Sequence, residues 1–321
     1  MLDRLLDTVL DRTVIPGYSA VGVRVRRRLP GWDASLPRME GKQVVVTGAT
    51  AGLGLAAARG FAELGAAVVL IGRDAARGEA ARADVAAAAR GGEVRLELAD
   101  VSSLASVRAL APKLGAVDVL VHNAGVLLPE RRLTAEGLEA TFATNVLGPF
   151  LLSRLLEPVL RERAPARVIW VASGGMYTQR LAIDDLQAEQ LAQDGDWDGS
   201  VVYARTKRAE VILCEEFASR LRDSGVVVHA MHPGWADTPG VVTSIPRFHR
   251  FAGPLLRSAE EGADTIVWLG AAEEPGRTSG QFWHDRRVRP THYMDRTRET
   301  PADRAALWAA CERLAGLTRA D

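Results

Sequence analysis

The fold of this 321-residue chain is decided by the stretch VVVTGATAGLG, residues 44–54. An apolar run leads into three glycines, Gly48, Gly52 and Gly54, and then into an alanine-rich segment that continues to Leu64. This order predicts a strand, a tight turn and a helix. Glycines in such a turn let the backbone approach a pyrophosphate, and the N–H groups that open the helix point toward its negative charge. We therefore expect the turn to bind a dinucleotide.

The spacing of these glycines is Gly-x-x-x-Gly-x-Gly, which departs from the Gly-x-Gly-x-x-Gly of the common dinucleotide fingerprint. Taken alone, the stretch could therefore be an ordinary tight turn. The choice between the two interpretations depends on residues further along the chain.

The composition limits the classes of function. With 47% hydrophobic and 25% charged residues, the chain can bury one substantial core. A formal net charge of zero gives no reason to expect a nucleic acid as partner. The two cysteines, Cys214 and Cys311, lack metal-ligand spacing, so we expect no metal site. We interpret them as reduced, buried thiols of a cytoplasmic protein.

Residues 1–40 form an extension ahead of the regular pattern. Its first leucines are interrupted by charged residues, unlike a signal peptide, and no apolar run is long enough to span a bilayer. The arginines at 24 and 26–28 could contact an anionic membrane surface, but we favour an arm that packs on the domain. We expect one short helix and a loop, broken by Pro16, Gly17, Pro30 and Pro37.

From Gly41 onward, strand-like runs alternate with helical segments. The apolar runs lie at 43–48, 66–71, 93–98, 117–122, 166–172 and 226–231, and a short run at 279–284 would close the edge. The helical segments lie at about 53–64, 75–90, 103–114, 135–161 and 201–223. This pattern predicts an α/β fold over residues 41–284: a single doubly wound parallel sheet of the Rossmann type, with helices on both faces. The tail, 285–321, would add a packing helix at about 301–316.

Two insertions interrupt this regularity, at 174–200 and 235–257. Both begin at the carboxyl end of a predicted strand, which is where ligands bind in open α/β sheets. We therefore expect them to enclose a substrate. The second insertion is apolar, which predicts a largely apolar substrate; its apolar residues are Trp235, Val241, Val242, Ile245, Phe248 and Phe251.

A second constellation is Tyr203-Ala204-Arg205-Thr206-Lys207, in a segment expected to be helical. Residues four apart share one helix face, so Tyr203 and Lys207 can serve one site. A free tyrosine, with a pKa of about 10, is a poor proton carrier near neutrality. A lysine ammonium one turn away lowers that pKa, and the tyrosine can then exchange the proton that accompanies hydride transfer at a carbonyl. Taken alone, the pair could also be an ordinary helix-surface contact.

Together with the glycine turn, this constellation resembles the short-chain dehydrogenase/reductase family over about residues 41–284. The resemblance implies a catalytic set of Asn145, Ser173, Tyr203 and Lys207, in which the serine would hydrogen-bond the substrate oxygen and the asparagine would help to hold a water beside the lysine. The sequence Asn123-Ala124-Gly125 matches the motif that ends the fourth strand of the family. The residues expected to bind the cofactor are Gly48, Thr50, Gly52, Leu53, Gly54, Arg73, Asp100, Val101, Asn123, Ala124, Gly125, Tyr203, Lys207, Pro233, Gly234 and Thr238.

Some residues depart from the family pattern. His122 stands where a second asparagine is frequent, and Ala172 stands where many members have a first serine. The long insertion between Ser173 and Tyr203 resembles the retinol-dehydrogenase-like branch. The run Ser173-Gly174-Gly175-Met176, the run from His232 to Gly240 and the N-terminal arm look like the dehydrogenase/reductase member 12 group, for which little about the substrate follows.

The preferred nicotinamide cofactor is indicated by the end of the second predicted strand. An arginine there suits a 2′-phosphate, whereas a carboxylate would accept the ribose hydroxyls. Arg73 follows the strand directly, and Asp74 has a separate reason to be acidic as the cap of the next helix. The sequence therefore favours NADP(H) over NAD(H).

We therefore expect an NADP(H)-dependent oxidoreductase that interconverts an alcohol and a carbonyl on a small apolar molecule, with Tyr203 as acid/base. The alternative is a non-catalytic, NADP-binding regulatory protein on the same fold. A complete set of Asn145, Ser173, Tyr203 and Lys207 argues against that alternative, because a pure binding protein does not need all four. Self-association into a homo-oligomer stays open.

Overall fold

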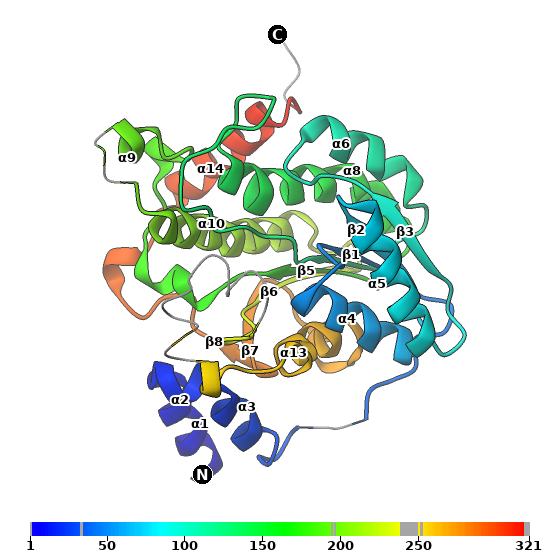
Figure 1. The fold of residues 1–321 in the computed structure, drawn as a ribbon. Coiled ribbons are helices and arrows are strands. Elements are labelled where there is room, and N and C mark those ends of the chain that lie inside the picture. The colour runs from blue at the N-terminus through cyan, green and yellow to red at the C-terminus, as the bar shows by residue number, and fades with distance from the viewer. Residues whose placement is uncertain are drawn as a thin grey trace.

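The computed structural model describes residues 2–32, 35–193, 195, 197–237, 250 and 253–317. These residues contain one eight-stranded sheet with the order β3-β2-β1-β4-β5-β6-β7-β8 (Figure 1). The strands are β1 (Gln43–Thr47), β2 (Ala67–Gly72), β3 (Val94–Leu98), β4 (Val119–His122), β5 (Ala166–Val171), β6 (Val226–Met231), β7 (Gln281–His284) and β8 (Arg287–Arg289). All neighbouring pairs are parallel except β7 and β8.

Helices cover both faces of the sheet, so the predicted doubly wound α/β fold is confirmed (Figure 1). One face carries α4, α5 and α13, and the other carries α6, α8, α10 and α14. The helices are α1 (Leu2–Arg12), α2 (Val14–Tyr18), α3 (Ala20–Arg26), α4 (Gly52–Glu63), α5 (Ala75–Ala88), α6 (Leu104–Leu110), α7 (Ala140–Phe142), α8 (Gly148–Glu162), α9 (Glu189–Gln193), α10 (Gly199–Arg220), α13 (Ala259–Ala271) and α14 (Pro301–Leu314).

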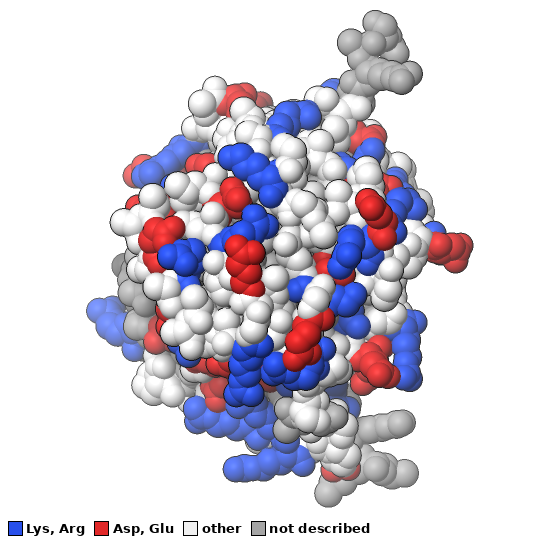
Figure 2. All heavy atoms as spheres, turned by 90° about the vertical axis from the view of Figure 1, so that its right-hand side faces the viewer, with Lys and Arg blue, Asp and Glu red and all other residues white. Residues whose placement is uncertain are grey.

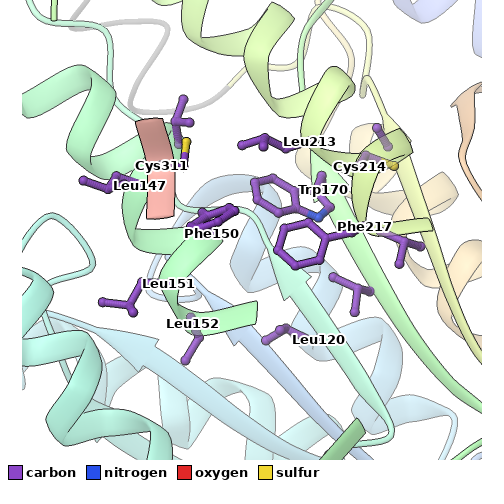
Figure 3. Packing of buried hydrophobic residues seen from close by; sticks show 14 of the residues in the cluster. Leu120, Leu147, Phe150, Leu151, Leu152, Trp170, Leu213, Cys214, Phe217 and Cys311 are labelled. Atoms are coloured by element: carbon purple, nitrogen blue, oxygen red, sulfur yellow. The ribbon is translucent and has the colours of Figure 1, made fainter. Parts of the chain in front are cut away.

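The core on the α8 and α10 side is built around aromatic rings (Figure 3). Phe150 lies 5.6 Å from Phe217 and 5.0 Å from Trp308, between ring centroids. Trp308 belongs to α14, so the predicted tail helix packs on the domain. Cys214 and Cys311 are buried free thiols in this cluster, as expected.

The predicted helix at 135–161 is interrupted. Residues 135–139 are not helical, and Glu139 caps α7 by accepting hydrogen bonds from two backbone N–H groups. A π-helical turn, Ala143–Leu147, then separates α7 from α8. Turns of this kind are frequent at functional sites, and this one contains Asn145.

The N-terminal extension folds into α1, α2 and α3, where the sequence predicted one short helix. Pro16 and Gly17 lie within α2 rather than after a helix. A proline is tolerated in the first turn of a helix because its missing N–H would have no partner there. Among the described residues, no helix is both long and apolar enough to cross a membrane.

The edge of the sheet also differs from the prediction, because β8 rather than β7 is the last strand. Asp285 and Arg286 form the two-residue turn between them, with φ values of 51° and 58°. Positive φ at both central residues is typical of a tight hairpin, although glycine or asparagine usually occupies such positions. The side chain of Asp285 is held by Arg26 of α3 and by Arg257.

Candidate active site

The glycine turn lies between β1 and α4, at the carboxyl edge of the sheet. Gly48 has φ of 66°, and a Cβ at this position would lie 2.9 Å from the Cα of Ala124. A Cβ at Gly54 would collide with the side chain of Asn123. Ala51 stands at the N-cap of α4 and offers no side-chain acceptor to the first N–H groups. A tight glycine turn with an uncapped helix N-terminus fits the pyrophosphate of a dinucleotide.

Asn123 braces this turn from the end of β4. Its Nδ2 donates to the carbonyl oxygens of Thr47, at 2.9 Å, and Gly48, at 3.2 Å. The hydroxyl of Thr47 accepts in return from the backbone N–H groups of Asn123 and Ala124. These bonds join β1 to β4, the two strands at which the strand order reverses and where ligands bind in such sheets.

Gly125 and Asn145 lie beside Lys207. A Cβ at Gly125 would lie 3.3 Å from Lys207 Nζ and 3.4 Å from Asn145 Oδ1. Asn145 is buried; its Oδ1 accepts from Val126 N–H at 2.8 Å, and its Nδ2 donates to Thr206 Oγ1 at 2.9 Å. The π-helical turn thus links the amide of Asn145 directly to α10, between Tyr203 and Lys207.

Lys207 is buried on α10 with its ammonium group near Tyr203. Its Nζ lies 5.4 Å from the centroid of the Tyr203 ring and donates to Val171 O at 2.9 Å. It also donates to Glu210 Oε1 at 2.7 Å. Burial opposes the ammonium charge, but the carboxyl group of Glu210 keeps the pKa of Lys207 above its ordinary value. The lysine therefore stays charged near neutral pH.

Glu210 was not among the residues predicted from the sequence. It is fully buried, and its second oxygen, Oε2, has no hydrogen-bond partner. Burial raises the pKa of Glu210 to about 7, against the opposing effect of Lys207. Its place three residues after Lys207 puts the two side chains on one helix face, which is the signal that could have found it.

Ser173 follows β5 and begins a short 3₁₀ turn over Gly174–Thr178. Its Oγ accepts from Gly175 N–H at 3.2 Å. A Cβ at Gly175 would lie 3.8 Å from that of Ala204, the residue after Tyr203. The structure therefore brings the serine turn against α10, and the regions of Asn145, Ser173, Tyr203 and Lys207 converge at one site.

Pro233 and Gly234 follow β6 and pack against the N-terminal arm. Tyr18 O accepts from Trp235 N–H at 2.7 Å, and the Tyr18 ring lies 4.3 Å from the ring of His232, between centroids. On its other side, a Cβ at Gly174 would lie 2.7 Å from Tyr18 Cε2. Tyr18 therefore fills the space between the serine turn and the segment expected to contact nicotinamide, which the sequence did not predict.

The other described residues that were predicted to bind the cofactor lie at the carboxyl edge of the sheet. Gly72 ends β2, and a Cβ at this position would collide with Thr50 of the glycine turn. Arg73, the next residue, therefore lies beside that turn. Asp74 caps α5 through Arg77 N–H at 2.9 Å, as the sequence predicted. Leu53 packs against Gly262 of α13, Asp100 accepts from Ser102, and Val101 packs against Gly148. Thr238 lies outside the described residues.

The structure describes most of the first insertion, 174–200, but only part of the second, 235–257. In the first insertion, Met176 and Tyr177 are buried in the hydrophobic core. Tyr177 donates its hydroxyl to Pro290 O at 2.7 Å. Trp235 of the second insertion packs edge-on against Tyr18. The rest of its apolar set, Val241, Val242, Ile245, Phe248 and Phe251, lies outside the described residues.

Comparisons with known proteins agree with this geometry. Residues 42–181 match the family model described as short chain dehydrogenase. Dehydrogenase/reductase SDR family member 12 of Bos taurus is 40% identical over 87% of both chains, and retinol dehydrogenase 12 of Bos taurus is 35% identical over 76% of this chain and 78% of its own.

A solved structure from Beutenbergia cavernae gives a further comparison. That protein, named as a candidate NAD(P)-dependent gluconate 5-dehydrogenase with bound NADP, is 26% identical, with a TM-score of 0.62 over 77% of this chain and 96% of its own. The glycine turn, the Tyr-x-x-x-Lys helix and these similarities agree. The chain belongs to the short-chain dehydrogenase/reductase family, oxidoreductases that act on alcohol and carbonyl groups.

Proposed function

We propose that this protein is an NADP(H)-dependent oxidoreductase that interconverts an alcohol and a carbonyl on a small, apolar molecule. The observation that carries the proposal is the convergence of Tyr203, Lys207, Ser173 and Asn145 beside the glycine turn. A nicotinamide, when bound, would supply or accept the hydride. The protein itself must position the substrate oxygen and move one proton.

Each residue of the set has a proposed role. Tyr203 exchanges a proton with the substrate oxygen through its hydroxyl, and Ser173 donates a hydrogen bond to the same oxygen. Lys207 holds a positive charge 5.4 Å from the centroid of the tyrosine ring, where it would stabilise negative charge that develops on the phenol oxygen during proton transfer. Asn145 holds the backbone at Val126 and the side chain of Thr206, and it would help to retain a water beside Lys207.

The preference for NADP(H) is supported by Arg73, an exposed guanidinium directly after β2. Asp74, the nearest carboxylate along the chain, is engaged as the cap of α5 and is therefore a weaker candidate for the ribose hydroxyls. The NADP-bound relative from Beutenbergia cavernae is consistent with this preference.

An apolar substrate is supported by the surroundings of the site. His232 is buried, and burial, with the positive charge of neighbouring groups, holds its pKa well below the ordinary value, so it stays neutral. Tyr18 and Trp235 add aromatic surface next to it. Retinol dehydrogenase 12 acts, by its name, on an apolar alcohol, which is consistent with the proposal.

The test is turnover of NADPH with a series of aliphatic aldehydes and ketones of increasing length. Because each buried CH₂ contributes about 0.8 kcal/mol, kcat/KM should rise steeply with length until the pocket is full. Tyr203→Phe should lower kcat by roughly 10²-fold or more while NADPH still binds. NADH in the same assay should be a poorer donor.

Two outcomes would contradict the proposal. Near-normal turnover by the Tyr203→Phe variant would remove the acid/base role. NADPH binding without turnover of any compound in the series would favour the alternative, a regulatory protein that binds the cofactor.

A further inference from the structure

Helix α1 docks with its polar side toward the protein and its apolar side toward solvent. Asp7 and Asp11, four residues apart, are buried against the body. Asp7 accepts from two N–H groups of Arg289, at 2.9 and 2.8 Å, and from Arg26 Nε at 2.9 Å. Asp11 accepts from the hydroxyl of Tyr293 at 2.5 Å. These contacts fix the orientation of the helix, so its outer face is determined by the fold.

The outer face of α1 is apolar. Leu5, Leu6 and Val9 are 61%, 40% and 50% exposed. Val14 and Ile15 are exposed on α2, which contacts α1. Val21 is exposed on α3, which contacts α2. Six of the eleven exposed large apolar side chains among the described residues therefore lie between residues 5 and 21. Such a concentration marks an interaction surface.

The exposed charges of the arm are mainly positive. Arg12, Arg24, Arg27 and Arg28 are exposed, whereas Asp7 and Asp11 are neutralised by buried partners. Arg24 and Arg27 face Glu261 and Asp264 at 3.0 and 3.8 Å. Lys and Arg side chains also gather at the lower end of the molecule in Figure 2, the end where Figure 1 draws α1, α2 and α3.

We propose that the arm, α1 to α3, binds the surface of an anionic phospholipid membrane. Leucine, valine and isoleucine side chains enter the boundary between headgroups and acyl chains, and Arg12 and Arg28, the exposed arginines of the arm that have no acidic partner among the described residues, contact the headgroup phosphates. A membrane can bind the exposed apolar side chains of the arm without a complementary groove. The exposed arginines of the arm favour lipids of negative charge. The arm lies on the surface and none of its described helices spans the bilayer. This inference does not depend on the proposed reaction.

The experiment is flotation of the full chain with vesicles of phosphatidylcholine alone or of phosphatidylcholine mixed with phosphatidylglycerol. Wild-type protein should float with the mixed vesicles, and high salt should weaken binding because the charges are screened. Leu5→Ser combined with Val9→Ser should lower binding by at least about tenfold, since two exposed apolar side chains lose their lipid contact. Arg28→Glu should lower it by about fivefold or more.

A matched control removes two equally exposed leucines elsewhere. Leu98 and Leu133 are 50% and 53% exposed and lie outside the arm, so Leu98→Ser with Leu133→Ser should leave flotation unchanged. Since all four positions are exposed, the variants should keep the wild-type circular dichroism and melting temperature.

Three results would overturn the inference. The first is absence of wild-type flotation with either kind of vesicle, and the second is equal loss of binding in the Leu98 and Leu133 control. The third is a dimer, seen by analytical ultracentrifugation without lipid, that the Leu5 and Val9 changes dissolve. That result would make the apolar face a contact between two copies of the chain.

Discussion

Glu210 gives Lys207 a buried counter-charge. Its Oε1 lies 2.7 Å from Lys207 Nζ, and the only other acceptor given to that ammonium by the described residues is Val171 O. A negative carboxylate here partly cancels the field that Lys207 exerts on Tyr203. Glu210 therefore acts on the tyrosine only through the lysine, as a positioning residue.

Glu210→Gln should shift the pH profile of alcohol oxidation toward lower pH. The amide keeps the shape and an acceptor for Lys207 but removes the negative charge, so the pKa of Lys207 falls and its positive charge acts on the Tyr203 hydroxyl without an opposing carboxylate. A shift on the order of one pH unit in kcat/KM is expected. Glu216→Gln is the control, because that carboxyl group pairs with Arg220 and Arg304. An unchanged profile for Glu210→Gln would show that the pair is structural only.

Sequence patterns indicated candidate residues for the site but not the partners of those residues. Tyr203 and Lys207 share a recognisable spacing, and the resemblance to the family added Asn145 and Ser173. Glu210 also has helical spacing, but a carboxylate near a lysine on a helix usually lies at the surface, and only burial distinguishes this pair. Tyr18 has no local signal, because its contacts with Gly174 and Trp235 depend on the tertiary fold.

At the scale of elements, the N-terminal arm, α1 to α3, packs against one side of the candidate active site. The ring of Tyr18 separates Gly174 from His232, while Arg257 donates to the carbonyl oxygens of Gly17, at 2.9 Å, and Ser19, at 3.1 Å. The arm is thus fixed on both sides of this ring. Its removal would leave the serine turn without support on that side.

Tyr18→Ala should lower kcat by roughly tenfold or more, because small displacements of positioning groups have large effects on rate. The affinity for NADPH should change little, since the glycine turn at Gly48–Gly54 is untouched. The variant should also lose about 3 kcal/mol of stability, typical of a deleted aromatic ring. Steady-state kinetics and NADPH titration check this, with Tyr18→Phe, which keeps the ring, as control. Wild-type kcat in Tyr18→Ala would show that the arm does not support the site.

The elements that the sequence missed lack the usual turn residues or pattern. The turn before β8 uses Asp285 and Arg286 where a glycine or asparagine would have indicated a hairpin. Buried ion pairs of Asp285 with Arg26 and Arg257 offset the cost of a positive φ at this residue. Those partners are distant in sequence, so local patterns do not reveal them. Helix α2 contains Pro16 and Gly17, and tertiary contacts override their low helix propensity. By contrast, apolar patterns in the sequence predicted the strands of the sheet and most of the helices that cover it.

At the scale of the whole molecule, several histidines are buried in neutral form. Burial lowers the pKa of His122 to about 3 and that of His284 to about 3, and it holds that of His232 well below the ordinary value. An unfolded chain protonates these imidazoles near pH 6.5, whereas the folded chain does not. The unfolded state therefore binds more protons below that pH, and the free energy of unfolding falls as the pH is lowered.

Each of the three histidines should lower the free energy of unfolding by about 1.4 kcal/mol per pH unit below pH 6, whereas Glu210, with its pKa raised to about 7, has the opposite effect and offsets about one of them. Urea denaturation at several pH values between 7.5 and 5 measures this slope. His122→Asn keeps a polar partner for Ser153, which lies 2.7 Å from the imidazole, but removes one titrating group. The slope should then decrease by about 1.4 kcal/mol per pH unit. An equal slope in wild type and variant would show that His122 does not contribute.

The ion pair between Arg26 and Asp285 joins residues 259 positions apart. A ribosome adds about 5–20 residues per second, so the arm leaves it roughly 10–50 s before Asp285 does. During translation, Arg26 and Asp7 have none of their final partners from β7 and β8, and Tyr18 has neither Gly174 nor His232 to pack against. The side of the active site behind Gly174 is therefore closed only when synthesis of the chain is nearly complete.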